Sequence, residues 1–282
     1  VDRWILSRLH SAAADANARL AVYDFGEAAR ILYQFFWSDF CDWYVELVKP
    51  LLAKDADPAR RAATLRTTVE CLSISLRLMH PFTPFVTEEI WQHFRSLPGL
   101  SAALAESIMI APWPEPDATR RAPDAEASMA MVMAVVRGVR DVRNKNNIPR
   151  PTKLTALVNA RDEAAARALR ERADLVTHLA NCERLEIGVG TAKPPHSATV
   201  VAGALEIYLP LEGIIDLGAE RTRLGNQAGK IEGQLTQVKA KLESAGFRTN
   251  APAELVAKEQ TRAADLEGQL AAVKASLREL GA

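Results

Sequence analysis

The 282-residue sequence has few cysteines and no net charge. Its three cysteines, Cys41, Cys71 and Cys182, are isolated, and no CxxC pair exists. This pattern argues against a disulfide framework and against a thiolate zinc site. Lysine plus arginine and aspartate plus glutamate each number 35. Because these charges cancel, any contact with nucleic acid must come from local basic patches.

The sequence also lacks a long apolar run and a targeting segment. No stretch approaches the roughly 20 apolar residues that a membrane-spanning helix needs. The first residues, Val1–Trp4, contain no initiator methionine and do not resemble a signal peptide. We therefore expect a cytoplasmic chain that is a piece of a longer protein and has no membrane partner.

Motifs that carry catalysis are absent as well. There is no P-loop, nucleophile elbow or zinc-protease signature, and Gly188-Val189-Gly190 lacks the next glycine of a dinucleotide fingerprint. The sequence thus predicts no catalytic residue, no metal site and no cofactor in this chain. The five histidines lack the spacing of metal ligands and stand at His10, His80, His93, His178 and His196.

Aromatic residues make up only 6% of the chain, and most of them gather in its first third. They lie in residues 35–46, in residues 80–91 and in the helix that precedes the first of these segments. Because large rings bury much area and dominate the core that they enter, this region predicts a well-built helical core.

The apolar pattern of the first 95 residues predicts four or five amphipathic helices joined by short links. This arrangement is typical of an antiparallel helix bundle. The helices cover residues 2–20, 24–52, 57–79 and 83–94, and Ser38-Asp39 restarts or kinks the second one. Their start signals are a capping box or an N-cap followed by proline, at Asp24 and Glu27, Asp57-Pro58 and Thr83-Pro84.

Two further segments complete a first domain at residues 1–150. Three prolines at alternate positions exclude a helix over residues 108–116, which we expect to form an extended strap anchored by Trp113. The pattern of residues 124–146 predicts a helix, which Ile148-Pro149 terminates.

Residues 151–216 have the pattern of a small α+β domain. Apolar runs predict strands at 154–158, 184–187, 199–201 and 205–209, with a helix at 162–180. Ala202-Gly203 predicts a tight turn between the last two strands.

Residues 217–282 carry two heptad-like segments around a turn that contains glycine, asparagine and proline. This pattern is typical of an antiparallel coiled-coil hairpin. At about 1.5 Å per residue, each arm extends roughly 40 Å. The chain as a whole is therefore mainly α: a helix bundle, a small α+β unit and a C-terminal hairpin.

Two charged clusters have more than one interpretation. Asp39, Asp42 and Glu46 share a helical face, which suits acid/base work or a hard cation, but structural pairs with arginines are favoured. A basic run near the end of the helix at 124–146 suits phosphate and base contacts. A solvated helix end, where cations favour the dipole, explains it equally well. This run contains Arg137, Arg140, Arg143, Asn144, Lys145, Asn147, Arg150 and Lys153, opposed only by Asp141.

Several segments resemble the C-terminal part of valyl-tRNA synthetases, in the right order and across essentially the whole chain. The related isoleucyl and leucyl enzymes share the His-Pro-Phe-x-Pro-Phe segment, whereas the Asp-Phe-Cys-Asp-Trp-Tyr block and the hairpin point to the valyl branch. The isoleucyl branch commonly ends in a cysteine-ligated zinc module, for which this chain lacks the cysteines. The segments lie at residues 2–9, 36–46, 80–91, 111–114, 143–149 and 205–216.

The resemblance implies that the bundle is an anticodon-binding domain and that the hairpin is an arm on the elbow of valine tRNA. The full enzyme joins valine to its tRNA with ATP and Mg²⁺, in catalytic and editing domains that this chain lacks. It implies an inactive fragment, a monomer, and neither DNA nor a membrane as partner.

The resemblance does not fix which residues touch tRNA, so geometry alone suggests them. On the first helix we expect contacts to the anticodon from Arg3, Arg8 and His10. Along the anticodon stem or the inner side of the tRNA we expect contacts from Arg143, Asn144, Lys145 and Arg150. On the arm we expect elbow contacts from Lys239, Lys241, Arg248 and Arg262.

Two other hypotheses stay open at this point. A hairpin with nearly balanced charge also suits a protein–protein interaction module. A stand-alone enzyme that uses the carboxylate face is disfavoured, because no cofactor or nucleophile motif accompanies that face.

Overall fold

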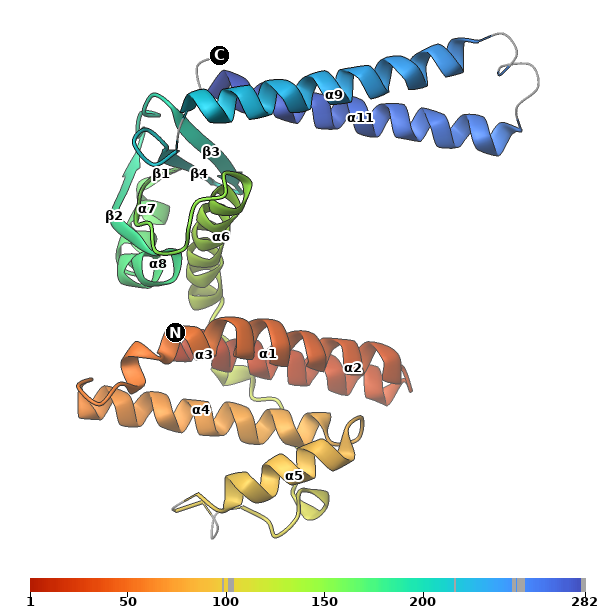
Figure 1. The fold of residues 1–282 in the computed structure, drawn as a ribbon. Helices are drawn as coiled ribbons and strands as arrows, with labels where there is room; N and C mark the ends of the chain where they lie inside the picture. The colour runs from red at the N-terminus through yellow and green to blue at the C-terminus, as the bar shows by residue number, and fades with distance from the viewer. Residues whose placement is uncertain (98, 101–103, 216, 245–246, 248–251, 280–282) are drawn as a thin grey trace. The chain divides into compact units, whose positions relative to one another are not determined.

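A computed structural model describes residues 1–282 except 98, 101–103, 216, 245–246, 248–251 and 280–282 (Figure 1). The chain divides into two compact units, Val1–Met131 (unit 1) and Val132–Ala282 (unit 2). The division falls inside a helix and not at residue 150, where the sequence pattern places its first domain boundary. The mainly α fold class, with a small sheet and a C-terminal helix pair, is confirmed.

Unit 1 is built from helices that pack against one another, with α1 in contact with both α2 and α4. The sequence signals for two helix starts are confirmed: the Asp24 carboxylate accepts from the amide of Glu27 at 3.3 Å, and that of Asp57 accepts from Arg60 at 2.7 Å. Because such caps satisfy amides with no partner inside the helix, they fix where α2 and α4 begin. The main helices are α1 (Asp2–Ala21), α2 (Phe25–Gln34), α4 (Pro58–Met79) and α5 (Pro84–Arg95).

The expectation that the Thr83 side chain caps the start of α5 is wrong. No side chain caps α5; the Thr83 hydroxyl instead donates to the carbonyl of Met79 at 3.2 Å. Pro84 alone sets the start of α5, because its fixed φ suits the first helical turn and it needs no amide partner there.

The aromatic block forms a π-helix, η1 (Phe35–Tyr44), which continues α2 without a break and leads into α3 (Val45–Val48) and the 3-10 turn η2 (Pro50–Leu52). This wider winding replaces the restart or kink that Ser38-Asp39 suggests. It buries Phe35, Phe40 and Tyr44 to 5% exposure or less and leaves Trp37 54% exposed.

The core of unit 1 consists mainly of large side chains from several elements. Trp4, Leu9 and Trp91 are each at most 1% exposed, and Trp91 packs with Leu76 and Ile108. The expectation that rings build this core is therefore confirmed for most of the aromatic block, with Trp37 as the exception.

The strap over residues 108–116 is only partly extended. It begins with a 3-10 turn, η3 (Ile108–Ile110), and a second turn, η4 (Ala118–Arg120), follows it. Ile108 is the buried anchor at 3% exposure, whereas Trp113 is 38% exposed and donates from Nε1 to the Asn17 side chain at 3.0 Å. The choice of Trp113 as the anchor is thus corrected, because Ile108 and Pro114 are the buried residues of this segment and Trp113 is partly exposed.

In unit 2 a four-stranded sheet has the order β2-β1-β4-β3, with β1 parallel to β2 and the other pairs antiparallel. The parallel pair needs a crossover, which α7 and α8 supply in place of the single helix expected at 162–180. The strands are β1 (Leu154–Ala160), β2 (Cys182–Val189), β3 (Ser197–Ala202) and β4 (Leu205–Pro210), and the crossover helices are α7 (Glu163–Arg170) and α8 (Ala173–Ala180).

The helix α6 (Pro123–Lys145) contains the boundary between the units, and its later turns lie close to the sheet. A methyl group at Gly138 would lie 2.9 Å from Ile207 on β4 and 3.2 Å from Val200 on β3. The glycine therefore permits the helix backbone to approach the sheet closely.

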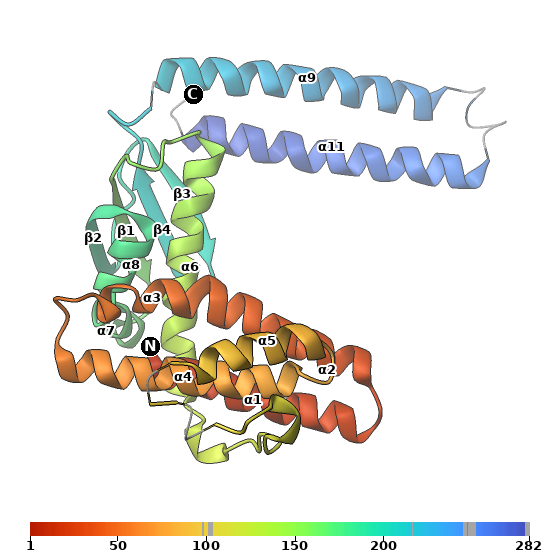
Figure 2. The same cartoon turned by 60° about the horizontal axis from the view of Figure 1, so that its bottom comes forward.

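The C-terminal hairpin consists of α9 (Leu217–Glu243) and α11 (Ala253–Glu279), which lie side by side in Figures 1 and 2. Glu232 pairs with Lys274 at 2.7 Å and Lys239 pairs with Glu267 at 2.5 Å. Because seven residues forward on α9 correspond to seven backward on α11, the pair is antiparallel, as the heptads predict. The seam is formed by Leu224, Ala228, Ile231, Leu235, Val238, Ala263, Leu266 and Val273.

In the described part of the chain, no helix combines the length and the hydropathy that crossing a membrane requires.

Candidate nucleic-acid interface

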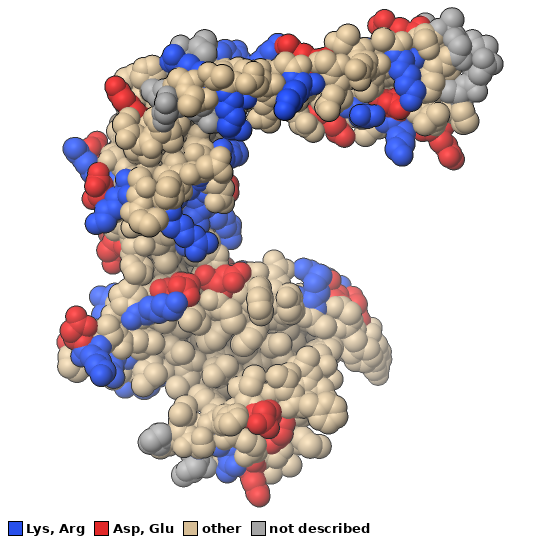
Figure 3. Space-filling model, viewed as in Figure 1, with Lys and Arg blue, Asp and Glu red and all other residues tan. Residues whose placement is uncertain are grey.

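The basic run around the end of α6 is the strongest local charge imbalance in unit 2. Residues 137–153 hold six lysines and arginines and one carboxylate, Asp141. Figure 3 shows lysine and arginine gathering over the α6 side of this unit, whereas both signs alternate along the hairpin. A surface that carries one sign of charge attracts a polyanion such as a nucleic-acid backbone.

Arg143 is the exception within this run, because its guanidinium is used inside the protein. It is 7% exposed and donates to the carbonyls of Pro149, Thr152, Ala180 and Asn181 at 3.3, 2.7, 3.3 and 2.9 Å. Burial lowers the pKa of this guanidinium. Arg143 thus ties the end of α6 to the segments around β1 and α8, and this position corrects its expected place among direct contacts.

Its exposed neighbours remain available at the surface. Asn144, Lys145 and Arg150 all lie at or just beyond the last turn of α6, and their side chains are exposed. The backbone that carries Arg150 is held in place, since its carbonyl accepts from the Asn181 side chain at 2.8 Å. The structure therefore brings three of the four residues expected along the anticodon stem to one solvent-facing corner.

On α1 the expected contact residues differ in exposure. Arg8 donates to Asp39 of η1 at 2.9 Å and to Glu126 of α6 at 3.4 Å. Burial opposes the charged form, but the two carboxylates outweigh it and raise the pKa of the guanidinium. The Arg8–Asp39 pair confirms that an acid of the aromatic block braces a neighbouring helix. Arg3 pairs with Asp124 at 3.2 Å and stays 72% exposed in its side chain.

His10 is buried at 6% exposure, and its Nδ1 accepts from the amide of Asp117 at 3.1 Å. Burial lowers the pKa of this histidine, so the ring is neutral near pH 7. His10 therefore holds the segment before α6, and this corrects its expected place among residues that touch a ligand.

On the hairpin, the three expected elbow residues that the structure describes pair with glutamates. Lys239 binds Glu267, while Lys241 and Arg262 bind Glu259 at 2.7 and 4.0 Å. All three side chains keep about half of their surface exposed. Arg248 lies outside the described residues. Lys239 and Lys241 pair across the two helices, whereas Arg262 and Glu259 both lie on α11, and all three cations still face solvent.

Exposed aromatic rings are the feature that the sequence interpretation missed, because it assigned the rings of the aromatic block to the core and gave no binding role to Tyr23, Phe25 or Tyr33. Tyr33 and Trp37 are 59% and 54% exposed and stack with their planes 4° apart and centroids at 6.1 Å. Tyr23 and Phe25, 80% and 55% exposed, meet edge to face at the turn between α1 and α2. Exposed rings are the groups on which unpaired RNA bases stack. The spacing of four residues between Tyr33 and Trp37 was a usable signal.

No group of three or more histidines, cysteines or carboxylates capable of holding a metal ion occurs among the described residues. The free cysteines Cys71 and Cys182 are buried, and burial raises the pKa of both thiols, to about 11 for Cys182. Neither thiol is therefore a nucleophile near pH 7.

Comparison with known families defines the class of the helical part. Residues 2–158 match the family described as the anticodon-binding domain of tRNA ligase. This span covers unit 1, all of α6 and most of β1, so the chain carries the anticodon-binding domain of a tRNA ligase.

The second match narrows the class. Residues 216–281, the hairpin, match the family described as the valyl tRNA synthetase tRNA binding arm. Similar curated proteins are the valine–tRNA ligases of Geobacter sulfurreducens, 39% identical over 279 residues, and of Xanthomonas euvesicatoria, 40% identical over 267 residues. The alignments cover 99% and 94% of this chain but only 31% and 27% of those proteins, in their C-terminal region. The chain belongs to the valine–tRNA ligase family.

Proposed function

We propose that the chain is the tRNA-binding part of a valine–tRNA ligase and that it recognises valine tRNA at two separate places. One observation carries this proposal: the two family matches fall on two differently built parts, a helical unit and a thin hairpin, in the order found in the relatives. A helical unit with exposed rings suits the unpaired bases of an anticodon loop. A rod of about 40 Å suits reach to a distant region of the same RNA.

The proposed contacts divide by chemistry. The exposed aromatics Tyr33 and Trp37, together with Arg3, offer stacking and charge on unit 1. Lys145 and Arg150 offer phosphate contacts beyond α6, with Asn144 beside them for a sugar or base edge. Lys239, Lys241, Arg248 and Arg262 are the proposed contacts of the arm with the tRNA elbow.

Aminoacylation itself belongs to the part of the relatives that this chain does not cover. In the whole enzyme, ATP and Mg²⁺ activate valine, which is then joined to its tRNA in the cytoplasm. The chain alone acts as a monomer that binds tRNA, with no DNA or membrane partner. We expect no ATP–pyrophosphate exchange from the isolated chain, and measurable valine-dependent exchange would overturn this part of the proposal.

Binding experiments with altered tRNAs test recognition. The chain is titrated with a valine tRNA transcript, with the same transcript carrying another anticodon, and with one whose elbow pairing is disrupted. We expect each alteration to weaken binding at least tenfold, and affinity for the unaltered tRNA to fall steeply with salt.

A second experiment deletes residues 217–282, which contain the hairpin. The shortened chain should remain sensitive to the anticodon and lose its sensitivity to the elbow. Equal binding of all three tRNAs by the intact chain would reject specific recognition and favour the protein–protein interaction module.

A further inference from the structure

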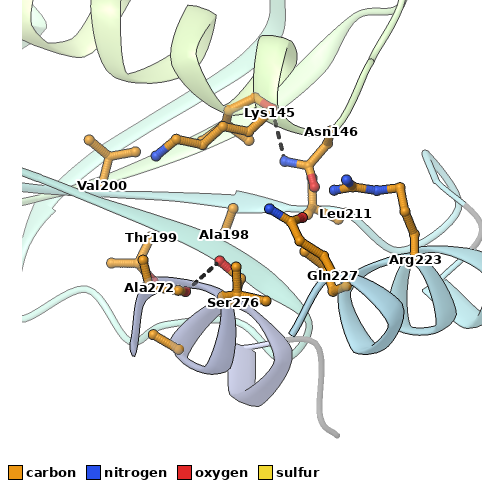
Figure 4. A pocket seen from close by; sticks show the side chains of 14 residues that line it. Lys145, Asn146, Ala198, Thr199, Val200, Leu211, Arg223, Gln227, Ala272 and Ser276 are labelled. Atoms are coloured by element: carbon orange, nitrogen blue, oxygen red, sulfur yellow. Dashed lines mark hydrogen bonds between the residues drawn. The ribbon is translucent and has the colours of Figure 1, made fainter. Parts of the chain in front are cut away.

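A hollow of about 580 Å³ lies within unit 2, where three parts of the fold meet. Its walls come from the last turn of α6, from β3, and from the base of the hairpin, where α9 begins and α11 ends (Figure 4). This volume lies in the range of small-molecule sites. The hollow adjoins the seam between α9 and α11, because Leu224 and Val273 of the seam also line it.

The lining combines positive charge with an apolar floor. Lys145 of α6 and Arg223 of α9 are its charged members, and none of the 14 described lining residues is an aspartate or glutamate. Val200 and Leu211 belong to the apolar part of the wall. A lining with cations beside an apolar floor favours a ligand that is an anion joined to a less polar body.

The two cations reach the hollow from different elements, with the amides of Asn146 and Gln227 between them (Figure 4). The Asn146 amide donates to the Val142 carbonyl at 2.8 Å, which holds this side chain at the end of α6. The hollow thus offers charge at its edges and hydrogen-bonding groups between them, an arrangement that matches a ribose hydroxyl flanked by phosphates.

We propose that this hollow binds a ribose–phosphate unit, and that the unit belongs to the backbone of the bound RNA. Lys145 and Arg223 contact the phosphate oxygens, while the sugar lies over Val200 and Leu211. The inference rests on the proposed tRNA-binding function and adds a contact at the base of the hairpin, away from both the anticodon and the elbow. A ligand held there touches α6 and the hairpin together, so it also fixes the angle of the arm to the sheet of unit 2.

The test uses the full chain and two kinds of variant. Lys145→Gln removes one cation, and Ala272→Phe fills the hollow from the exposed surface of α11 without any change of charge. We expect both to weaken binding of valine tRNA about fivefold to tenfold near 150 mM salt. The slope of log K against log salt should fall by about one for each phosphate that a variant no longer binds. Lys145→Arg should restore most of the affinity.

Matched controls separate the hollow from general effects. Ala271→Phe places the same ring one residue away, outside the lining, and Lys54→Gln removes an exposed lysine from unit 1. Both should leave the affinity and the salt slope within twofold of the unaltered chain. Circular dichroism of every variant shows whether α9 and α11 stay folded. Folded variants at Lys145 and Ala272 that bind tRNA as the unaltered chain does would overturn the proposal.

A second experiment distinguishes a phosphate of the RNA backbone from that of a free nucleotide. AMP and inorganic phosphate are titrated into the chain by calorimetry, with and without Lys145→Gln. Millimolar or undetectable binding of AMP, combined with the weaker tRNA binding of the variants, supports an RNA backbone site. Micromolar AMP binding that Lys145→Gln abolishes, with tRNA binding unchanged, would overturn the RNA assignment in favour of a free nucleotide. If the unaltered chain binds no tRNA at low salt, the proposed tRNA-binding function fails. The titration with AMP then tests by itself whether the hollow binds a ribose–phosphate unit.

Discussion

The helical unit and the hairpin are both made of amphipathic helices, yet different forces hold them together. Trp4, Leu9 and Trp91 in unit 1 are at most 1% exposed, and Trp91 packs with Leu76 of α4 and Ile108 of η3. Along the hairpin the seam residues are smaller on average and keep 5 to 9% exposure, and ion pairs such as Lys239–Glu267 flank the seam. A two-helix rod has no third layer, so it cannot bury its apolar face completely.

One chain thereby serves two mechanical needs. A deep core makes a rigid platform whose surface groups stay in fixed positions, which suits the recognition of bases. A seam with charged flanks gives length with few residues, but its stability then depends on salt and pH. The two parts should therefore respond differently to the same perturbation.

The largest expected effect comes from a change in the core of unit 1. Trp91→Ala removes a side chain that packs on Leu76 and Ile108 and donates to the Ala105 carbonyl at 3.0 Å. We expect unit 1 to lose about 3–5 kcal/mol of unfolding free energy. All five tryptophans lie before residue 132, so tryptophan fluorescence during urea unfolding reports this unit alone. The exposed Trp37→Ala is the control, with a loss below about 0.5 kcal/mol; equal losses would contradict the contrast between core and surface.

A smaller loss is expected when the same kind of change is made in the hairpin. Leu266→Ala truncates a seam residue that is 7% exposed. We expect a loss of about 2 kcal/mol, at the low end for buried leucine, because the open rod leaves a cavity that solvent reaches. Helicity followed by circular dichroism should drop at lower urea while the tryptophan transition stays in place. A shift of both transitions together would show that the two units unfold as one.

The stability of unit 1 and that of the hairpin should begin to fall at different pH values. Burial lowers the pKa of His10 from its ordinary 6.5, so its contribution to unit 1 is complete above pH 6.5 and declines as the pH falls below that value. The hydrogen bond from Lys241 lowers the pKa of Glu259 from 4.5, so its contribution to the hairpin declines only below pH 4.5. Fluorescence-detected unfolding at pH 7.5 and 5.5 should show the drop in unit 1, and His10→Gln should abolish the drop. Loss of the hairpin before unit 1 on acidification would contradict this order.

The smallest expected effect is the loss of an ion pair beside the seam of the hairpin. A double-mutant cycle with Lys239→Ala and Glu267→Ala should give a coupling of about 0.2–1 kcal/mol at low salt, because both side chains are half exposed. In 1 M NaCl this coupling should vanish. A coupling that survives 1 M salt would show that the pair acts through packing and not through charge.

Local signals in the sequence predicted the fold where a feature depends on near neighbours alone. Asp57-Pro58 marked the start of α4, and the heptads marked the hairpin, because capping and periodicity involve residues within one or two turns. Thr83 failed as a cap because its hydroxyl donates back to the Met79 carbonyl and accepts from no amide of α5, and nothing in the sequence ranks these two arrangements.

The site was less predictable, for reasons that are also physical. Arg143 and Lys145 are two residues apart and both basic, yet one is buried against four carbonyls and the other faces solvent. Only the distant segments around β1 and α8 distinguish them. Likewise Trp37 was assigned to the core because large rings bury much area, but in η1 it is 54% exposed. The charge and aromatic content of the sequence indicated which segments carry the candidate interface. Tertiary contacts decide which side chains of these segments are exposed on it.

The π-helix at Phe35–Tyr44 has a consequence for the length of this segment. Loss of a single residue from it would change the rotation between α2 and α3, because the number of residues and the wider winding set that rotation together. Leu47 and Val48, buried at 1% and 2% exposure, follow this segment directly and depend on that rotation for their place in the core. Point substitutions in this block change one contact, whereas a one-residue deletion changes the phase of a whole helix. The number of residues between α2 and α3 is therefore as much a determinant of the fold as their identity.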